Sequence, residues 1–485
     1  MPVKPQALSY IDGRLCESGT SHDVISPATG HVVGTVAWAG EAEAAAALEA
    51  ARRSAAAWRA LGLDGRARHM AELCSAIAQA EVELRTTVQN ETGKTWEQTE
   101  EDYRLLVDSL DFYAQAVRSV GPEVLHDRAG THRHELRREP VGVVVAFIAW
   151  NFPLLNLGYK LGPAMAAGCP IVIKPSSRTP LAAAVVGRLC HEVGLPAGVV
   201  NILSGDDATV GDALSRSDIP ALVTLIGSTD TARHVMAVGS TTVKRYSLEL
   251  GGNAPVLVYP DADLDLAADT IALLKFANAG QVCVAPNRVL VHESVAAALT
   301  ERLCRRAERI RVGTGPAGSA DMGPLIDAGA VERVLGLVKS ALNQGARLVI
   351  GGSRPDGAAT DCYLAPTVVD GVTPQMDLFR QEVFGPVVSI TTFTRHDDPV
   401  GLANDTDAGL TAYVFARDES VIGAAVDRLE FGEVHVNGVK YAIELPHGGF
   451  KQSGVGHDCS VLALEDYLVH KRVTRPLAMP PGGNR

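Results

Sequence analysis

Short apolar runs rich in β-branched residues alternate with helical stretches along most of this chain. The first run, VGVVVAFIAW (141–150), is almost entirely apolar, as expected for a strand buried on both faces of a parallel sheet. Helical stretches separate it from three further runs, PIVIKP (170–175), VVNILSG (199–205) and ALVTLIGS (221–228). Strands that alternate with helices at this spacing indicate βαβ units, so we predict a doubly wound parallel sheet.

A second series of the same kind extends from about Gly251 to Lys451. Its strands include APVLVY (254–259), NRVLVH (287–292), RLVIGG (347–352), PVVSITTF (386–393) and GEVHVNG (432–438). Two series imply two α/β domains with a ligand crevice between them, and 485 residues are also too many for one ordinary core. Residues 41–85, rich in Ala and Glu, are expected to form one or two amphipathic helices.

Two segments belong to neither series. They are THRHELRREP (131–140) and EDYLVHKRVTRPL (465–477), which are polar and strand-like. From their pattern alone, edge strands of the main sheets are one interpretation. The tail from Met479 to Arg485 is expected to be disordered.

Charge and cysteine usage exclude several function classes. The net charge of −12 argues against a nucleic-acid partner. No apolar run reaches the length of a membrane span, and Met1 to Tyr10 contain no apolar core of a secretory signal. The eight cysteines form no CxxC pair, which is typical of reduced thiols rather than of disulfides or a zinc site. We therefore expect a cytoplasmic protein that binds neither nucleic acid nor membrane.

One cysteine lies where it could face a cleft. Cys283, in FANAGQVCVAPNR (276–288), follows a helix and a Gly-containing turn and precedes a strand. A lone cysteine is more often a small buried hydrophobe, so a catalytic role needs a base and an oxyanion donor nearby. Glu249 in SLELGGNAP ends a strand, and Asn151 in AWNFP follows the strand at 141–150. Glu249 could activate water and Asn151 could donate to an oxyanion, but a salt-bridge glutamate and a turn asparagine are equally open interpretations.

A turn that contains glycine weakly indicates a phosphate-binding site. Gly227, Ser228 and Thr229 follow a predicted strand and open a predicted helix, whose N-terminal N–H groups can hold a phosphate. No GxGxxG is present at this turn, so the usual dinucleotide fingerprint is missing.

Several separate segments together resemble the aldehyde dehydrogenase superfamily, and the resemblance covers nearly the whole chain. In the family's order they are PVGVVVAFIAWNFP (140–153), IKPSSRTP (173–180), IGSTDTARHV (226–235), LELGGNAP (248–255), NAGQVC (278–283), EVFGPV (382–387) and PHGGFKQSGVG (446–456). The interval from Glu249 to Cys283, 283 − 249 = 34 residues, is also similar to that of the family.

The resemblance implies the hydrolytic, NAD(P)-dependent oxidation of an aldehyde to a carboxylic acid, with no metal required. By position, Cys283 resembles the nucleophile, Asn151 and the Cys283 N–H the oxyanion hole, and Glu249 the base that activates water. The implied fold is α/β with two doubly wound parallel-sheet domains and a small β arm. A Rossmann-like cofactor domain would take residues 1–120 and 141–250, and a catalytic domain residues 251–452. The oligomerisation arm, 121–140 and 453–485, implies a homodimer or homotetramer.

The same comparison assigns the remaining site residues. The residues implied to contact the cofactor are Trp150, Lys174, Ser176, Ser177, Gly227, Ser228, Leu250, Glu382 and Phe384. Those implied to line the substrate channel are Phe152, Asn156, Tyr159, Val284 and Tyr441.

Two departures from the family pattern bear on specificity. Ser177 stands where many NAD-preferring members carry a glutamate, so NADP should be accepted and preferred, with Lys174 and Arg178 available to its phosphate. NAGQVCVAPNRV resembles succinate-semialdehyde dehydrogenases, whereas PHGG with SVLALEDYLVHKRV resembles aminoaldehyde dehydrogenases. The positions of the arginines that bind the succinate-semialdehyde carboxylate correspond to Tyr159 and Ala277, which argues against that substrate. Arg118 is a solvated surface residue or lies at the channel mouth.

Two other functions stay open. CoA-acylating relatives lack the carboxylate at the Glu249 position, so its presence here argues against them. A catalytically inactive structural or binding relative is disfavoured by the presence of Cys283, Glu249 and Asn151 together.

Overall fold

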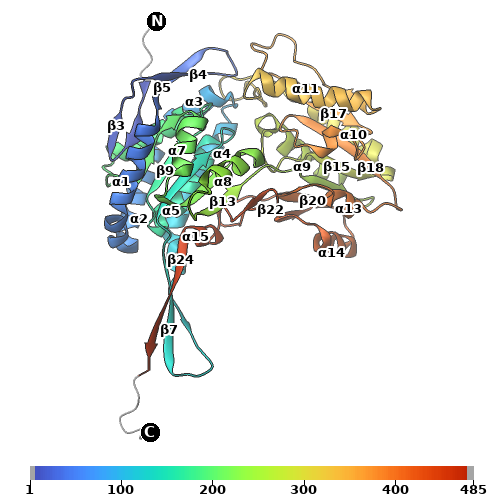
Figure 1. The fold of residues 1–485 in the computed structure, drawn as a ribbon. Coiled ribbons are helices and arrows are strands. Elements are labelled where there is room, and N and C mark those ends of the chain that lie inside the picture. The colour runs from blue at the N-terminus through green and yellow to red at the C-terminus, as the bar shows by residue number, and fades with distance from the viewer. Residues whose placement is uncertain (1–5, 478–485) are drawn as a thin grey trace.

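Two large twisted sheets, each covered by helices, make up most of the chain, and a narrow three-stranded sheet projects away from them (Figure 1). The computed structural model describes residues 6–477. The first large sheet has the strand order β23 (Gly454–Val455), β13 (Arg245–Glu249), β12 (Pro220–Ile226), β8 (Val143–Ile148), β9 (Ile171–Pro175), β10 (Val200–Ile202), β2 (Ser9–Ile11) and β3 (Arg14–Cys16).

The five central strands of this sheet are parallel, and its edges are antiparallel. From β8 the chain adds β9 and β10 on one side and β12 and β13 on the other, so the strand order reverses between β8 and β12. In doubly wound sheets, ligands bind beyond the carboxyl ends of the strands at such a point. The residues that follow β8 and β12 are therefore placed for a ligand.

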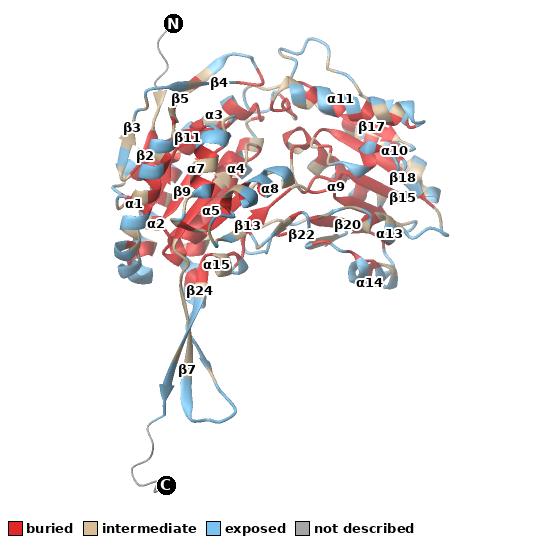
Figure 2. Ribbon diagram, viewed as in Figure 1, coloured by how far each residue is buried: buried red, intermediate tan, exposed pale blue. Residues whose placement is uncertain are grey.

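Alternating side chains of β8 enter two different cores, which explains its continuous apolar sequence. Val144 and Ala146 pack with α2 (Gly62–Gln79), α4 (Gln98–Ala116), α5 (Pro153–Ala167) and α6 (Leu181–Glu192). Val143 and Val145 pack with α1 (Glu41–Ala60), α7 (Asp212–Arg216) and α8 (Thr229–Gly239). Each fully buried side chain of this kind contributes about 1.5–3 kcal/mol relative to exposure. Both faces of the sheet are buried, as Figure 2 shows.

The N-terminal region departs from the sequence prediction in two respects. Residues 41–85 were expected to form one or two helices but belong to three, because α2 ends at Gln79 and α3 (Glu81–Thr92) follows Ala80. A separate sheet that the pattern did not reveal contains β1 (Gln6–Ala7), β4 (Ser21–Ile25), β5 (Val32–Ala39) and β11 (Ser204–Gly205).

The second large sheet has the order β16 (Arg347–Ile350), β17 (Thr367–Asp370), β18 (Val387–Phe393), β15 (Arg288–His292), β14 (Pro255–Val258), β20 (Thr411–Phe415) and β21 (Glu433–Val436). All neighbours are parallel except β16 and β17. Its helices are α9 (Leu264–Phe276), α10 (Glu293–Ala307), α11 (Ala328–Asn343), α12 (Asp377–Arg380), α13 (Pro399–Asn404) and α14 (Glu419–Arg428). The predicted α/β class with two parallel-sheet series is confirmed.

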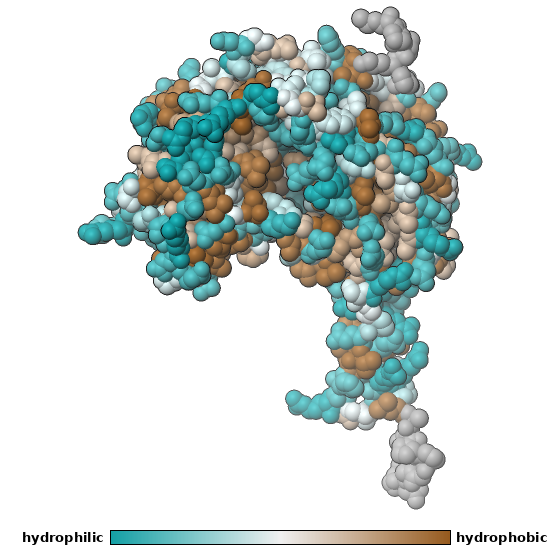
Figure 3. All heavy atoms as spheres, turned by 180° about the vertical axis from the view of Figure 1, so that it is seen from behind, coloured by the Kyte–Doolittle hydropathy of each residue, from teal (hydrophilic) through white to brown (hydrophobic). Residues whose placement is uncertain are grey.

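The projecting sheet, which we call the arm, contains β6 (Glu123–Leu125), β7 (His132–Pro140) and β24 (Leu468–Pro476). β7 and β24 pair antiparallel from Pro140–Leu468 to His132–Pro476. Its surface is largely hydrophilic (Figure 3). These strands therefore form a sheet of their own, and the interpretation as edge strands of the main sheets is wrong. The predicted arm range and disordered tail extend into 478–485, outside the described residues.

The chain returns to the large sheets before it enters the arm. β22 (Phe450–Lys451) pairs with β19 (Ala408–Gly409), β23 joins the first sheet beside β13, and α15 (Leu462–Asp466) leads into β24. Among residues 6–477, no helix has both the length and the apolar character needed to cross a membrane.

Candidate active site

A cavity of about 380 Å³ lies where strands of the first sheet end and loops of the second sheet begin. Its walls contain Cys283, Glu249 and Asn151 together, although these residues are far apart in the sequence. The other predicted site residues that line it are Trp150, Phe152, Asn156, Tyr159, Gly227, Ser228, Leu250, Val284, Glu382, Phe384 and Tyr441.

The turn before Cys283 has an unusual backbone. Asn278, Ala279 and Gly280 all adopt positive φ, at 46°, 53° and 74°, a region that non-glycine residues rarely occupy. The Asn278 side chain donates to the Asn151 carbonyl over 3.0 Å, and the Gln281 side chain accepts from the N–H of Ile326 over 2.8 Å. Such conformations persist where the surroundings fix them, and here they hold the half-buried Cys283 against the cavity.

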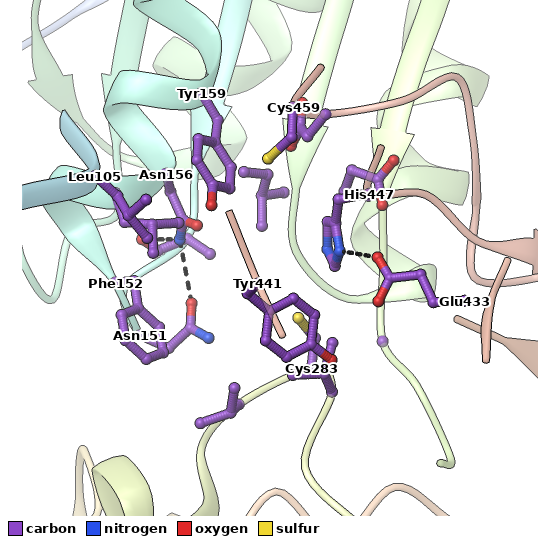
Figure 4. Close-up of a pocket in the computed structure, with 18 of the residues that line it drawn as sticks. Leu105, Asn151, Phe152, Asn156, Tyr159, Cys283, Glu433, Tyr441, His447 and Cys459 are labelled. Atoms are coloured by element: carbon purple, nitrogen blue, oxygen red, sulfur yellow. Dashed lines mark hydrogen bonds and ion pairs between the residues drawn. The ribbon is translucent and has the colours of Figure 1, made fainter. Parts of the chain in front are cut away.

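The Asn151 amide is oriented from both ends. It follows β8, directly before α5 begins. Its Nδ2 donates to the Gln281 carbonyl over 3.1 Å, and its Oδ1 accepts from the Asn156 amide over 3.2 Å, as Figure 4 shows. The amide nitrogen carries two hydrogens. One is bound to the loop that precedes Cys283, so the other remains for an oxygen beside the thiol.

Glu249 is the last residue of β13, and its carboxyl group is buried. Neither carboxyl oxygen has a hydrogen-bond partner within 6–477, and no ion pair of Glu249 occurs there. Burial raises the pKa of this carboxyl well above its usual value, while the charges of His447 and Lys160 oppose the rise. A carboxyl of this kind can serve as a base near neutral pH. The salt-bridge interpretation of Glu249 is therefore wrong for the described chain.

Two glycines after Glu249 allow the two halves of the site to approach closely. A Cβ on Gly252 would lie 2.5 Å from the Cys283 carbonyl oxygen, and one on Gly251 would clash with the Glu382 carboxyl. The N–H of Gly252 donates to Glu382 Oε1 over 3.0 Å. The LELGG segment therefore needs glycine for contact between backbones, as a close approach requires.

One side of the cavity fits a dinucleotide. Ser228 is the N-cap of α8, where its Oγ accepts from the N–H of Thr231 over 3.1 Å, and a helix N-terminus favours phosphate. Trp150 and Phe384 make an edge-to-face pair with ring centroids 5.5 Å apart. Burial raises the pKa of Glu382 to about 7, and this residue lines the same side of the cavity. A helix N-terminus, a carboxyl group and two aromatic rings thus lie together on this side.

Three predicted cofactor residues lie outside the cavity wall, at the end of β9. The buried Lys174 ammonium pairs with Asp207, and Ser176 Oγ accepts from the N–H of Arg178 over 3.3 Å. Ser177 is half-buried beside them. Arg178 pairs with Asp327. Both cations assigned to a 2′-phosphate therefore have carboxylate partners, which the sequence did not predict.

The substrate side is aromatic and polar. The Tyr413 hydroxyl donates to the Val284 carbonyl over 2.7 Å and lies 3.2 Å from the Tyr441 hydroxyl. No arginine occurs among the described residues that line the cavity. Arg118 does not line it and pairs on the surface with Asp64 over 2.6 Å, as its solvated interpretation predicted.

Sequence reasoning missed one pair of residues in the wall. His447 Nδ1 lies 2.6 Å from Glu433 Oε1, and both residues line the cavity with Cys283 (Figure 4). PHGGFKQSGVG was used for the family resemblance, but no role was assigned to its histidine. The position of this histidine directly before two glycines was the sequence feature that could have indicated a role in the site.

The fold is doubly wound and has a turn suited to phosphate, and one cavity holds a cysteine, an amide and a carboxyl group. Together these features are typical of a dinucleotide-dependent enzyme that works through a thiol. The model of the aldehyde dehydrogenase family matches residues 15–473, and this chain belongs to that family. The predicted family, enzyme class and fold are confirmed.

Curated relatives and solved structures are similar to this chain over nearly its full length. An NADP(+) succinate-semialdehyde dehydrogenase of Escherichia coli is 34% identical, with 96% of each chain covered. A betaine aldehyde dehydrogenase of Bacillus subtilis is 34% identical and covers 97% of this chain and 98% of its own. The crystal structure of a Staphylococcus aureus betaine aldehyde dehydrogenase variant with NAD+ has a TM-score of 0.93 and 32% identity, with 99% of each chain covered. The protein is an aldehyde dehydrogenase that uses NAD or NADP.

Proposed function

We propose that Cys283 is the nucleophile of this aldehyde dehydrogenase, with Asn151 as an oxyanion donor and Glu249 as the base for hydrolysis. The observation that carries the proposal is the shared cavity, in which all three side chains meet beside a fixed turn. The product is the carboxylic acid.

The first step joins the Cys283 sulfur to the aldehyde carbon. The carbonyl oxygen then becomes negative in a tetrahedral thiohemiacetal. The second hydrogen on Asn151 Nδ2 and the N–H of Cys283 supply donors fixed before the reaction, and removal of one such donor typically lowers the rate by about 100- to 1,000-fold.

The second part of the reaction releases the acid. When bound, NAD or NADP supplies the hydride acceptor. Collapse of the thiohemiacetal leaves an acyl group on Cys283 as a thioester. Glu249 then takes a proton from water, which attacks the thioester carbon and frees the Cys283 thiolate. Burial without hydrogen bonds raises the proton affinity of Glu249, which suits this role.

The cofactor position follows from the same surroundings. Ser228 and the first turn of α8 hold the pyrophosphate, and Gly227 and Leu250 lie beside it. Glu382 and Phe384 contact the nicotinamide ribose, while Trp150 and Phe152 flank the nicotinamide and the substrate. Lys174, Ser176 and Ser177 belong to the adenosine end.

We infer that NADP is accepted and preferred, because Ser177 lacks the carboxylate that would exclude a 2′-phosphate. The phosphate and Asp207 compete for the Lys174 ammonium. The Asp207 side chain is 84% exposed, so it is free to turn into solvent when the phosphate binds.

The substrate class follows from the channel wall. Phe152, Asn156, Tyr159, Val284 and Tyr441 provide aromatic and amide surface, and arginine is missing from the described lining. Lys440 belongs to the same wall, but a guanidinium that could hold a second carboxylate in a bidentate manner is missing from the described lining. This favours an aldehyde other than the semialdehyde named for the Escherichia coli relative.

Assembly and location belong to the same proposal. The arm is the oligomerisation element of a homodimer or homotetramer, because its edges are open to pairing. The division predicted from the sequence was a cofactor domain of residues 1–120 and 141–250, a catalytic domain of 251–452 and an arm of 121–140 with 453–485. Among the described residues, β23 and α15 belong to the first large sheet and its core, so we limit the arm to β6, β7 and β24. All eight cysteines are free, which fits a reducing, cytoplasmic location.

A CoA-acylating reaction and an inactive role are the alternatives. The buried Glu249 carboxyl beside Cys283 favours hydrolysis over transfer to CoA. Stoichiometric reduction of cofactor by added aldehyde, without CoA, separates all three.

Replacement of the nucleophile tests the proposal directly. Cys283→Ala should abolish aldehyde oxidation, while fluorescence titration shows cofactor binding nearly unchanged. Cys190→Ala, at a buried cysteine outside the cavity, is the matched control and should stay active. If Cys283→Ala keeps activity within about tenfold of the parent, a barrier change of only ~1.4 kcal/mol, another group is the nucleophile.

A further inference from the structure

A second acid–base pair faces Cys283 from the wall formed by the C-terminal part of the second sheet. Glu433 is the first residue of β21, and His447 lies in the following loop. The N–H of His447 donates to the Asp458 carbonyl over 2.9 Å, and the Asp458 N–H donates back over 2.8 Å. The Glu433 N–H donates to the Leu410 carbonyl over 3.0 Å. Both backbones are therefore fixed.

The ring of His447 has a defined orientation. Its Nδ1 is 2.6 Å from Glu433 Oε1, and the two side chains are 16% and 11% exposed. Burial would raise the pKa of Glu433, but His435, whose Nε2 lies 3.5 Å from Oε2, and the hydrogen bond with His447 outweigh burial and lower it to about 2. Glu433 is thus a carboxylate, which only accepts, so Nδ1 of His447 carries a proton. The other ring nitrogen, Nε2, is left for the Cys283 side chain, which lines the same cavity and contributes to the raised pKa of His447.

The charges around His447 favour its protonated form. Burial lowers its pKa, but the hydrogen bonds to Cys283 and Glu433 and the charges of Glu433 and Glu249 outweigh burial, and the pKa is raised well above its usual value. The other titratable groups nearby include the buried pair of Lys160 and Asp458, 2.6 Å apart, and the side chains of His435 and Cys459.

We propose that His447, oriented by Glu433, is a catalytic residue that removes the thiol proton of Cys283 and holds it as an imidazolium beside the thiolate. This inference rests on the proposed role of Cys283 as nucleophile. Glu433 does not touch the thiol and is a positioning residue. A cysteine with an adjacent base that a third group orients is a recurring form of activated nucleophile.

Protons and electrons balance within the pair. The S–H bond of Cys283 breaks, an N–H bond forms at His447 Nε2, and the sulfur keeps the electron pair. That pair then forms the C–S bond to the aldehyde. The proton stays on His447 until hydrolysis of the thioester returns the thiolate. Glu249 handles the water proton separately, so two bases serve two steps.

Alkylation of Cys283 tests the proposal without aldehyde or cofactor. The rate of carbamidomethylation by iodoacetamide, followed by peptide mass spectrometry, reports the thiolate fraction at each pH. At about pH 6 the parent should be alkylated at Cys283 faster than a variant that lacks the His447 imidazole. In His447→Gln the rate at about pH 6 should fall roughly tenfold or more, and the midpoint of the profile should move upward.

Two further variants separate catalysis from folding. Glu433→Gln keeps the size of the positioning side chain but removes its charge, so its alkylation midpoint should lie between those of the parent and His447→Gln. His457→Gln, at an exposed histidine outside the cavity, is the matched control and should keep the parent profile. Thermal melting checks that each variant is folded.

The outcomes are distinct. If folded His447→Gln and Glu433→Gln both keep the parent alkylation profile, His447 does not activate the thiol and this inference fails. If His447→Gln does not fold, an unchanged profile in Glu433→Gln overturns the inference by itself. Activity in Cys283→Ala would instead overturn the proposed function.

Discussion

The Glu249 carboxyl group is buried without a hydrogen-bond partner in the described chain, which is an unfavourable environment for a charge. Burial raises its pKa, so the neutral form persists to a higher pH than in an exposed glutamate. In the proposed hydrolysis, its deprotonated form would accept a proton from water. The raised pKa gives this carboxylate a higher proton affinity than that of an exposed glutamate.

Turnover and the first half-reaction should consequently respond differently to pH. Below the raised pKa Glu249 is neutral and cannot accept a proton, so steady-state turnover should rise with pH until it ionises. The first burst of reduced cofactor does not need this base and should persist at the lower pH. Stopped-flow absorbance measures both phases. A burst amplitude that falls in parallel with turnover would place the pH effect before hydrolysis.

Glu249→Gln should isolate the same step. The amide keeps the size of the side chain but cannot take up a proton. We expect one rapid burst of reduced cofactor and then a stalled thioester on Cys283, visible by intact-protein mass spectrometry. Absence of both burst and adduct would mean that Glu249 acts before hydride transfer.

Cofactor choice should depend on two residues that act in opposite directions. Ser177→Glu introduces a carboxylate near the 2′-phosphate position and should lower the ratio of kcat/KM for NADP to that for NAD. Asp207→Asn frees the Lys174 ammonium from its partner and should raise that ratio. A charged hydrogen bond is worth roughly 1.5–3 kcal/mol, which corresponds to about one to two decades. A parent that favours NAD tenfold, with an unchanged ratio in Ser177→Glu, would show that residue 177 does not govern the choice.

At the scale of elements, the turn between α9 and Cys283 is the most demanding connection in the site. Gly280 adopts a φ of 74°, and a Cβ there would clash with the Gly385 carbonyl. Gly280→Ala should lower the melting temperature and reduce kcat, because Gln281 and Cys283 must move. Gly336→Ala in α11 has open space around its Cβ and should stabilise by roughly 0.5–1 kcal/mol. Equal melting temperatures for the two variants would show that the positive φ at Gly280 is not important for stability.

Strands were more accessible to sequence reasoning than the connections between them. β8 could be predicted because a strand buried on both faces has no polar positions to interrupt the apolar run, and in β9 only Lys174 interrupts it. The division of 41–85 into three helices was not predicted, because only the first break has a breaking residue, Gly62 with a φ of 66°, whereas Ala80 at the second break has no strong breaking tendency.

In the candidate site, too, features carried by local sequence were predicted and contacts between distant segments were not. Cys283, Glu249 and Asn151 were found because motif order carries them, and they do meet in the cavity. The contact of His447 with Glu433 depends on how the loop after β21 folds back, a tertiary property that local sequence does not encode. The pairing of Lys174 with Asp207 was missed for the same reason.

For the whole molecule, the arm predicts association. It projects from the body of the chain, and its outer strand edges are unpaired in the single chain. Open edges of this length usually pair with another chain. Light scattering at micromolar concentration should give two or four times the mass of the chain. A monomer mass under those conditions would refute the proposed assembly.

The arm can be completed only late in translation, so assembly depends on how far synthesis of the chain has proceeded. β7 pairs with β24 from Pro140–Leu468 onward, so its partner is synthesised 468 − 140 = 328 residues later. At about 5–20 residues per second, β7 waits roughly 15–65 seconds on the ribosome before it can pair with β24. A chain that stops short of residue 468 lacks β24 and leaves β7 with an open edge, which is prone to aggregation. Only chains that have been translated almost to the end can therefore complete the arm and associate with a partner chain.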